Sequence, residues 1–296
     1  MRQVVSQTHL PPFDKAAYTP QNHPYAIHVG EVIEEKVHRR LPAPILRTLE
    51  RIIHQREIND ILYRYSHLEG MDFLEALVGE FRLDLDWVHP ERLPEHGRCI
   101  FASNHPLGGM DGIAISYMLG RHYGDIRYMV NDMLYHLKPL QPVFLPLNKH
   151  GAQGKEAVAM LQEAMRSDVP IGTFPAGFCS RVYDGRIQDQ EWRKTFITQA
   201  INHERDIVPL HFVGQNSRHF YWIWHIKNAL RMKFDIGTAL LPDELFRATG
   251  KSFRIIVGEP ISWQSLRDST LSPEAEAARI RSLCYALRDE YDSRKE

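Results

Sequence analysis

Apolar residues between positions 45 and 81 recur every three or four positions, as they do along one face of an amphipathic helix. They are Ile45, Leu49, Ile52, Ile53, Ile58, Ile61, Leu62 and Tyr65, and then Leu74, Leu77, Val78 and Phe81. Charged residues such as Arg47 and Arg56 take the opposite face. The spacing predicts a group of helices, and Asp72 with Glu75 predicts a capping box for the last one. Such helices either pack on a core or lie on a membrane surface, and the pattern allows both.

From residue 83 onward, short apolar runs alternate with helical patterns. The runs predict strands at 83–88, 99–103, 126–130, 143–147, 171–174, 207–213 and 253–257. Helical spacing predicts helices at 112–119, 154–166 and 191–202, and a last one from about 273 to 291. This alternation is typical of a mainly parallel sheet with helices on both faces. We therefore predict an α/β fold, with a mainly parallel central sheet flanked by helices and an N-terminal helical segment.

The same patterns divide the chain into four segments. Residues 1–25 contain Pro11, Pro12, Pro20 and Pro24 with little periodicity, which predicts a loose N-terminal arm. We expect a helical segment at 26–84, the α/β core at 85–262 and a C-terminal helical segment at 263–296. No repeat, low-complexity tract or clear linker interrupts these segments.

Composition excludes some classes of function. The chain has 296 residues and a net charge of -1, so no excess of cations is present to neutralise nucleic-acid phosphates. Cys99, Cys179 and Cys284 are widely spaced and form neither a disulfide framework nor a CxxC metal site, which favours a reducing compartment. Residues 1–21 hold no apolar signal core. No uncharged apolar run approaches the ~20 residues of a transmembrane helix.

The turn from Asn104 to Gly112 carries the strongest candidate chemistry. It follows the strand at 99–103, and two glycines shape it. His105 could take a proton from a hydroxyl group, and Asp111 could accept a hydrogen bond from the other ring nitrogen. Alternatively, Asp111 caps the next helix and His105 is an ordinary member of the 16 histidines. The local sequence leaves both interpretations open.

Four loops follow strand ends and are expected to meet. They are the turn at 104–112, the loop after Leu147, the loop at 175–186 and the loop at 214–218. Sites in open α/β sheets gather at the carboxyl ends of the strands. The predicted topology therefore places one site at this edge of the sheet.

The turn also resembles a known family. Asn104-His105-Pro106-Leu107-Gly108-Gly109-Met110-Asp111-Gly112 resembles the first block of the glycerolipid acyltransferases, the lysophosphatidate acyltransferase superfamily, where Asn-His is followed shortly by Asp. Residues 143–149, 172–181 and 207–210 are similar to the second, third and fourth blocks, in the same order. The most similar branch contains bacterial ornithine-lipid and glycine-lipid O-acyltransferases and proteins labelled hemolysins. Gly214–Tyr221 is similar to that branch too, so the resemblance covers roughly residues 85–262.

This sequence departs from the family pattern at several positions. The spacing between His105 and Asp111 is one residue longer than usual. Ala176 stands in place of the third-block glutamate, and Cys179 stands where arginine is expected, with Arg181 two positions further on. Asn148-Lys149 replaces a common second-block arginine. Since these positions contact the acceptor's phosphate in typical members, the changes predict an acceptor other than lysophosphatidate.

The resemblance implies an O-acyltransferase without a bound cofactor. His105, oriented by Asp111, would deprotonate the hydroxyl of a lysolipid-like acceptor, such as a lyso-aminolipid. The oxygen would then attack a fatty-acyl thioester of acyl carrier protein or coenzyme A, and main-chain N–H groups would stabilise the oxyanion. Residues expected to bind the substrates are Asn104, Gly108, Gly109, Lys149, Phe174, Pro175, Gly177, Ser180, Arg181 and Arg218. The three cations among them would hold an anionic head group, or they are ordinary surface charges.

The implied partners are acyl carrier protein and a membrane lipid surface, with no nucleic acid. The implied location is cytoplasmic, peripherally associated with the cytoplasmic membrane. Residues 219–232 place Trp222 and Trp224 beside Lys227 and Arg231, as in segments that contact membranes, although core packing explains the aromatics equally.

Two other functions remain open at the sequence level. The chain could be a lipid-binding or membrane-active, hemolysin-like module that kept the fold without turnover. It could also be a thiol-dependent hydrolase that uses Cys179, although free cysteines often serve as small buried apolar residues. No HExxH or similar spacing supports a metal site.

Overall fold

A mostly parallel sheet forms the centre of the protein. The computed structural model describes residues 13–31, 42–131, 134–147, 152–229 and 236–293. Its sheet has the strand order β1-β9-β8-β2-β5-β3-β4, and only the β8–β9 pair is antiparallel. The strands are β1 (Asp84–Val88), β2 (Cys99–Ser103), β3 (Arg127–Val130), β4 (Phe144–Pro146), β5 (Ile171–Thr173), β8 (Asp206–Val213) and β9 (Ser252–Val257). This confirms the predicted fold class.

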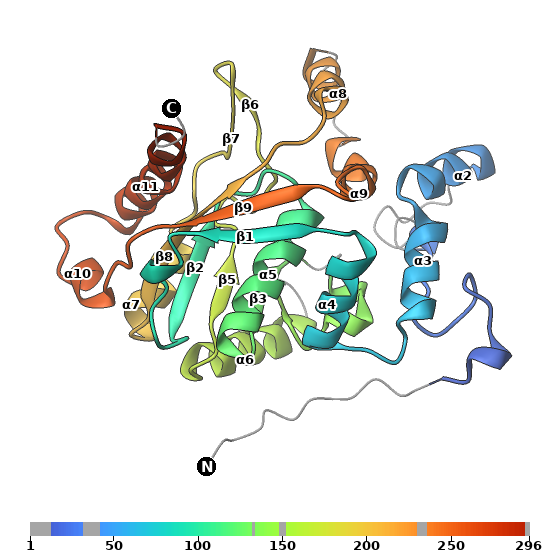
Figure 1. Ribbon diagram of the computed structural model, residues 1–296, viewed down its shortest axis with the longest axis horizontal. Helices are drawn as coiled ribbons and strands as arrows, with labels where there is room; N and C mark the ends of the chain where they lie inside the picture. The colour runs from blue at the N-terminus through green and yellow to red at the C-terminus, as the bar shows by residue number, and fades with distance from the viewer. Residues whose placement is uncertain (1–12, 32–41, 132–133, 148–151, 230–235, 294–296) are drawn as a thin grey trace.

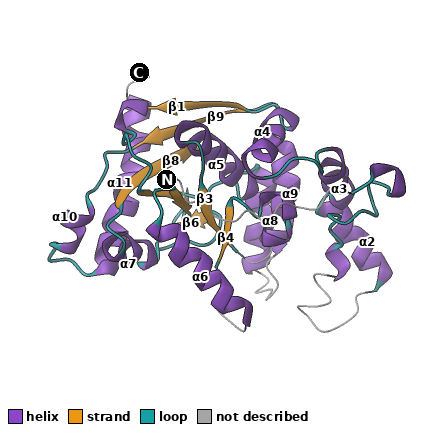
Figure 2. Cartoon of the chain, turned by 90° about the horizontal axis from the view of Figure 1, so that it is seen from below, coloured by secondary structure: helices purple, strands orange, loops and turns teal. Residues whose placement is uncertain are grey.

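Each face of the sheet is covered by its own helices (Figures 1 and 2). α4 (Gly70–Glu80) and α5 (Gly109–Tyr123) contribute to one hydrophobic cluster. α6 (Ala152–Arg166), α7 (Thr195–Asn202) and α11 (Pro273–Ser293) contribute to the other. Alternate residues of β2 supply the two clusters, with Phe101 in the first and Ile100 in the second, because successive strand side chains point to opposite faces.

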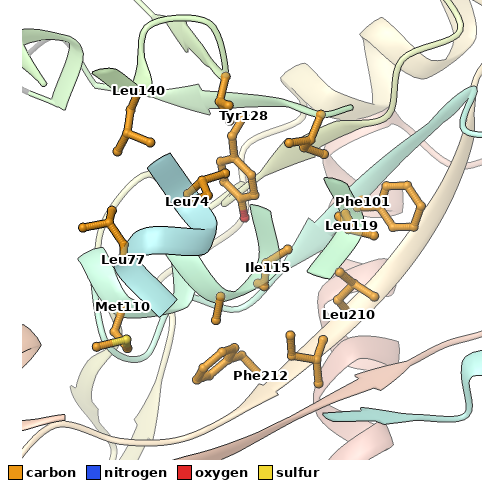
Figure 3. Close-up of a cluster of buried hydrophobic side chains, with 14 of the residues drawn as sticks. Leu74, Leu77, Phe101, Met110, Ile115, Leu119, Tyr128, Leu140, Leu210 and Phe212 are labelled. Carbon is orange, nitrogen blue, oxygen red and sulfur yellow. The ribbon is translucent and has the colours of Figure 1, made fainter. Parts of the chain in front are cut away.

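The first cluster shows how the helices are fixed on the sheet (Figure 3). Leu74 of α4 and Ile115 of α5 are fully buried beside Tyr128 of β3 and Phe101 of β2. Burying such side chains stabilises a fold by roughly 1.5–3 kcal/mol each. The helix that carries Asp111 is therefore held rigidly, which matters for the site below.

A third, smaller cluster covers the edge of the sheet where β2, β5 and β8 end. It joins α8 (Arg218–Ala229) and α9 (Ile236–Arg247) to the antiparallel hairpin of β6 (Arg181–Tyr183) and β7 (Arg186–Gln188). Phe220, Tyr221 and Leu240 are its buried members, and Ile52 of α2 (Ala43–Ile52) packs against it. In Figure 1 the hairpin and α8 project from the same side of the molecule.

The remaining elements are short. They are α3 (Gln55–Arg64), α10 (Trp263–Arg267) and the 3₁₀ turns η1 (Lys15–Ala17), η2 (Pro90–Arg92), η3 (Leu134–His136) and η4 (Lys138–Leu140). The described part of the expected N-terminal arm, residues 13–25, packs against α3. Tyr25 is buried there, and His23 Nε2 lies 3.1 Å from the carbonyl oxygen of Asn59. Burial lowers the pKa of His23.

The predicted capping box at Asp72 is wrong. The N-cap of α4 is Glu69, whose side chain makes no capping bond, and Asp72 lies inside the first turn. Gly70 has a φ of 57°, a conformation that glycine adopts without steric cost, so the chain enters α4 through this glycine. The capping-box spacing of Asp72 and Glu75 is therefore coincidental.

Candidate active site

Three of the four loops expected to meet at the carboxyl edge of the sheet do meet there. β8, β2 and β5 are adjacent and parallel, so their ends deliver the following loops to one place. The main-chain N–H of Ser180 donates to His105 O over 2.7 Å. Asn216 Nδ2 donates to Pro106 O over 3.0 Å. The fourth loop begins after Leu147, and its predicted site residue Lys149 lies outside the described residues.

His105 and Asp111 contact each other despite the longer spacing. His105 Nδ1 lies 3.1 and 3.2 Å from the two carboxylate oxygens of Asp111. The extra residue is absorbed by Gly108, which is the N-cap of α5 and has a φ of 80°. A side chain at this φ would be strained, and a Cβ there would meet Leu241 at 3.0 Å. The turn therefore requires glycine at this position.

Asp111 is a buried carboxylate in the first turn of α5, where it does not act as the N-cap. Besides His105, it accepts hydrogen bonds from the main-chain N–H groups of Leu107 (2.8 Å) and Gly112 (2.9 Å). These donors compensate for its loss of water, and the positive end of the helix dipole adds to them. Because a carboxylate only accepts, Nδ1 of a neutral His105 carries the ring proton, and Nε2 is left to accept one.

Phe174 fixes the plane of the His105 ring. The two ring centroids lie 3.7 Å apart at an interplanar angle of 17°, and Phe174 packs in turn on Tyr128 at 5.0 Å. Phe174 follows β5 directly and begins a turn in which Gly177 N donates to Phe174 O over 2.9 Å. Gly177 has a φ of 72°, and Pro175 is buried. The imidazole is thus held from one side by Asp111 and across its face by Phe174.

Among the buried cations of the described chain, Arg181 lies nearest in sequence to the His105–Asp111 pair. It is 6% exposed, and its Nη1 donates to the carbonyl oxygens of Cys179 (2.9 Å) and Ser180 (3.1 Å). The face of Phe220 lies 4.8 Å from its guanidinium carbon. Within the described residues, no carboxylate forms an ion pair with Arg181, and only Nη1 makes hydrogen bonds. The remaining donors of this guanidinium are free to bind an anion.

The other predicted substrate-binding residues differ in their surroundings. Asn104 bridges β2 to β8, because its Nδ2 donates to Phe212 O (3.1 Å) and its Oδ1 accepts from Phe212 N (2.7 Å). Both ends of its amide are therefore used by the sheet. Gly108 and Gly109 lie in the turn itself, next to α9. Arg218 is exposed at the first residue of α8.

Asp189 is a residue of the site that the sequence did not reveal. Its side chain is 1% exposed, and its Oδ1 accepts from His105 N (3.2 Å) and from the hydroxyl of Ser180 (2.5 Å). It stands in the polar run Gln188-Asp189-Gln190-Glu191, which in sequence resembles the exposed entry to a helix. No local pattern distinguishes it.

Cys179 is buried and poorly suited to nucleophilic attack. Its Sγ donates to Pro106 O at 3.3 Å, and burial raises the pKa of the thiol well above its usual range. A thiol that stays protonated is a weak nucleophile. This arrangement disfavours the thiol-dependent hydrolase.

Metal-binding groups and membrane-spanning helices are both absent from the described ranges. No group of three or more His, Cys, Asp or Glu is arranged there to hold a metal ion. None of the helices in those ranges is long and apolar enough to cross a membrane.

Comparison with known proteins identifies the fold's relatives. A family profile described as Acyltransferase matches residues 31–294. A lyso-glycine lipid O-acyltransferase of Phocaeicola vulgatus is 40% identical over 267 residues, covering 89% of this chain and 95% of the relative. One of Bacteroides thetaiotaomicron is also 40% identical over 267 residues, covering 89% and 98%. The 1-acyl-sn-glycerophosphate acyltransferase structure from Thermotoga maritima aligns with a TM-score of 0.45 at 14% identity, covering 90% of each chain.

Proposed function

The chain belongs to the acyltransferase family and is an acyltransferase, and on that premise we propose that it transfers a fatty acyl group from a thioester to the hydroxyl of a lyso-glycine lipid. The observation that carries this proposal is the His105–Asp111 contact beside Arg181, whose free donors face no carboxylate of the described chain. The two relatives named as lyso-glycine lipid O-acyltransferases supply the acceptor. The sequence departures at Ala176 and Cys179 agree with an acceptor that lacks the usual phosphate.

His105 and Asp111 act as the general base and its orienting acid in this proposal. His105 Nε2 removes the hydroxyl proton of the acceptor, and the oxygen attacks the thioester carbonyl carbon. The tetrahedral intermediate collapses with cleavage of the C–S bond, and the imidazolium returns the proton to the leaving thiolate. Asp111 holds Nδ1–H and stabilises the transient positive charge of the ring. No covalent acyl-enzyme is needed.

The oxyanion of the intermediate needs hydrogen-bond donors. The first turn of an α-helix leaves main-chain N–H groups without helical partners. In α5 this turn begins at Gly109, four residues beyond His105, where the absence of a side chain lets a substrate approach the main chain. We assign the oxyanion site to the N–H groups of this turn, including those of Gly108 and Gly109.

Arg181 binds the head group of the acceptor. A glycine head group presents a carboxylate, and a guanidinium binds a carboxylate through two parallel hydrogen bonds. Ser180 N donates a hydrogen bond to the main-chain oxygen of His105, and Arg181 is the next residue along the chain. The main chain of Arg181 therefore lies close to that of the base. The distance between a head-group carboxylate and the acceptor hydroxyl would then match the distance from Arg181 to His105 Nε2. Lys149 and Arg218 are secondary candidates for the same charge.

The acyl donor is a thioester of acyl carrier protein or of coenzyme A, and no bound cofactor takes part. The two donors share the reacting thioester and differ only in the carrier. A parallel assay with palmitoyl-acyl carrier protein and palmitoyl-coenzyme A decides which carrier is used.

The central experiment measures transfer of a labelled acyl chain to lyso-glycine lipid, lyso-ornithine lipid and lysophosphatidate. We expect product with lyso-glycine lipid, and a loss of about 1,000-fold in kcat for His105→Ala. His122→Ala is the matched control, because His122 is exposed at the far end of the same helix. Full activity of His105→Ala would remove His105 as the base. Absence of product with all three acceptors would reject the proposed reaction.

A lipid substrate requires contact with a membrane surface, and we assign this contact to the exposed aromatics beside the site. Trp222 and Ile226 are 60% and 36% exposed, and their spacing puts them on one face of α8. Phe178 (51%) and Tyr183 (36%) are exposed on the neighbouring loop and hairpin, where Tyr183 packs on Trp224 at 5.9 Å. Exposed aromatics of this kind suit the interface between lipid and water.

Sedimentation with anionic vesicles tests this surface. Phe178→Ala combined with Trp222→Ala should lower vesicle binding while thermal unfolding stays unchanged. Leu271→Ala is the control, since Leu271 is 46% exposed in the segment between α10 and α11, and Figure 1 shows α10 and α8 at opposite ends of the molecule. Equal binding by the two variants would exclude this surface. Trp224 is a poorer target, because it is partly buried.

A further inference from the structure

Asp189 lies in the loop between β7 and α7, and its side chain contacts the main chain of the His105 turn. Its Oδ1 accepts from His105 N at 3.2 Å and from Ser180 Oγ at 2.5 Å, and its Oδ2 accepts from Trp192 Nε1 at 2.9 Å. Within the described chain, no lysine, arginine or histidine side chain forms an ion pair with it. His105 N and Trp192 Nε1 can only donate, one to each oxygen. Burial raises the pKa of Asp189, and the hydrogen bonds from Ser180, Trp192 and His105 oppose that shift because they favour the ionised carboxylate, which accepts at both oxygens.

The main chain of His105 is held at both of its polar groups. Asp189 accepts from its N–H, and Ser180 N donates to its carbonyl oxygen over 2.7 Å. Ser180 and Asp189 flank the β6–β7 hairpin, and the Ser180 hydroxyl joins them. Any movement of the hairpin base relative to the His105 turn would break these bonds together.

Asp189 is itself anchored to α11. Its main-chain N–H donates to the hydroxyl of Tyr285 over 2.7 Å, and its carbonyl oxygen accepts from Arg281 Nη2 over 2.6 Å. α11 is a helix of 21 residues packed on β8 and β9. The carboxylate is therefore fixed by the body of the protein, and it transmits that position to the turn.

We propose that Asp189 is a positioning residue that holds the His105 main chain in register with Asp111 and whose negative charge favours the imidazolium formed during acyl transfer. The inference rests on the proposed function for the identity of the reaction. Two carboxylates then contact His105, and each has a separate role. Asp111 fixes the ring through Nδ1, and Asp189 fixes the main chain from which the ring projects.

The groups around Asp189 include side chains that stay uncharged and two arginines, Arg181 and Arg281, that stay charged. Cys179, Cys284 and Tyr285 face Asp189 from three sides, and burial raises the pKa of each well above neutral, so they remain uncharged. Arg281 on α11 carries a permanent charge and bonds to the main-chain oxygen of Asp189. Asp111 is the other carboxylate at His105.

A purely structural role is the competing explanation, and a pair of variants separates the two. Asp189→Asn alone would point its amide N–H group at the Trp192 N–H. Trp192→Phe removes that donor, so Asp189→Asn/Trp192→Phe can keep an oxygen facing His105 N and Ser180 Oγ while it loses the charge. Trp192→Phe alone is the reference, since it carries the same loss of the indole bond and keeps the carboxylate.

Three measurements are made on both variants. Relative to Trp192→Phe, the double variant should show about 10-fold lower kcat, with the acceptor KM within about twofold. The acid limb of its pH–rate profile should move down by about one pH unit, because an opposite charge nearby favours the protonated ring. The titration midpoint of the His105 ring, followed by NMR without substrate and assigned with His105→Ala, should move in the same direction.

The outcomes separate this inference from the proposed function. If the double variant and Trp192→Phe share kcat, pH profile and His105 midpoint, and differ only in melting temperature, Asp189 is a structural staple and the inference is overturned. If the His105 midpoint moves but the wild-type protein transfers no acyl group to any acceptor, the inference stands and the proposed reaction fails.

Discussion

Each edge of the central sheet buries an arginine, and the two edges treat it differently. At the amino edge, just before β8, Arg205 is fully buried and donates only to main-chain carbonyls. They belong to Cys99, Ala164, Met165, Ser167 and Val169. At the carboxyl edge, Arg181 is nearly as buried, but its hydrogen bonds come from Nη1 alone within the described chain.

The difference separates a cation that the fold uses completely from the one to which we assign the head group. Arg205 ties the end of α6 to the starts of β2 and β5, so every direction of its guanidinium is used by the fold. Burial lowers its pKa to about 10, which is the cost of holding a charge without a carboxylate. Within the described residues Arg181 uses Nη1 alone, and the proposed head-group role draws on its remaining donors. Burial by itself does not separate the two arginines, whereas their hydrogen-bond partners do.

The largest expected effect comes from removing the saturated arginine. Arg205→Met should lower the free energy of unfolding by about 3–5 kcal/mol, because it leaves several carbonyls buried without donors. Urea denaturation measures it. Arg98→Met is the control, since Arg98 bonds to the carbonyl oxygens of Arg166, Ser167 and His203 but is partly exposed. A loss below about 1 kcal/mol for Arg205→Met would contradict its structural assignment.

The second prediction extends the comparison to histidines. His211 of β8 is buried against Cys284 and Tyr285, and burial lowers its pKa to about 4. An unfolded chain binds this proton near pH 6.5. The unfolded state therefore holds more protons between these values, and stability falls as the pH drops from about 6.5 to about 4.

The contribution of His211 should reach about 3 kcal/mol at the acid end of this range. In His211→Phe, unfolding free energies measured from pH 7 to 4 should fall less steeply than in the wild type. His122→Phe, an exposed substitution, should leave the slope unchanged. Parallel slopes for His211→Phe and the wild type would mean that folding does not change the pKa of His211.

The smallest expected effect falls on binding rather than folding. Arg181→Lys keeps the charge but loses the fork of donors, so KM for lyso-glycine lipid should rise about 10- to 100-fold with little change in melting temperature. Arg186→Lys, on the exposed end of the hairpin, is the matched control. If Arg181→Lys lowers the melting temperature and leaves KM unchanged, Arg181 is a second Arg205 and the comparison fails.

The sheet was predictable because its signals are local. β2, β5 and β8 are runs of apolar residues bounded by polar residues and turns, and the structure places each within about one residue of the predicted limits. The local sequence left the His105–Asp111 contact open, and the expectation of it came from the family resemblance; the spacing, one residue longer than the family pattern, could not show whether the two side chains meet. The start of α5 at Gly109 rather than Gly112 shows that helix boundaries depend on geometry that the pattern lacks.

The residues that organise the site were not predictable, because they act across long distances in sequence. Asp189 reaches His105 over 84 positions, and nothing in its own neighbourhood indicates burial. The β6–β7 hairpin was missed although a signal exists. Asp184-Gly185 between alternating residues is a two-residue hairpin turn, and both residues have positive φ, of 50° and 74°. α8 was obscured by aromatic residues without a clear period, and Pro242 interrupts the pattern of α9.

The pairing of β1 with β9 has a consequence for synthesis of the chain. Asp84 lies beside Ser252 in a parallel pair, so the first strand of the sheet has no neighbour until the last strand has been made. Contacts this far apart in sequence form slowly, because the loop between them must be closed first. In a chain that is still on the ribosome, the N-terminal helices and the apolar face of β1 would therefore lack part of their packing. Until β9 has been synthesised, β1 is an exposed strand edge that chaperones can protect.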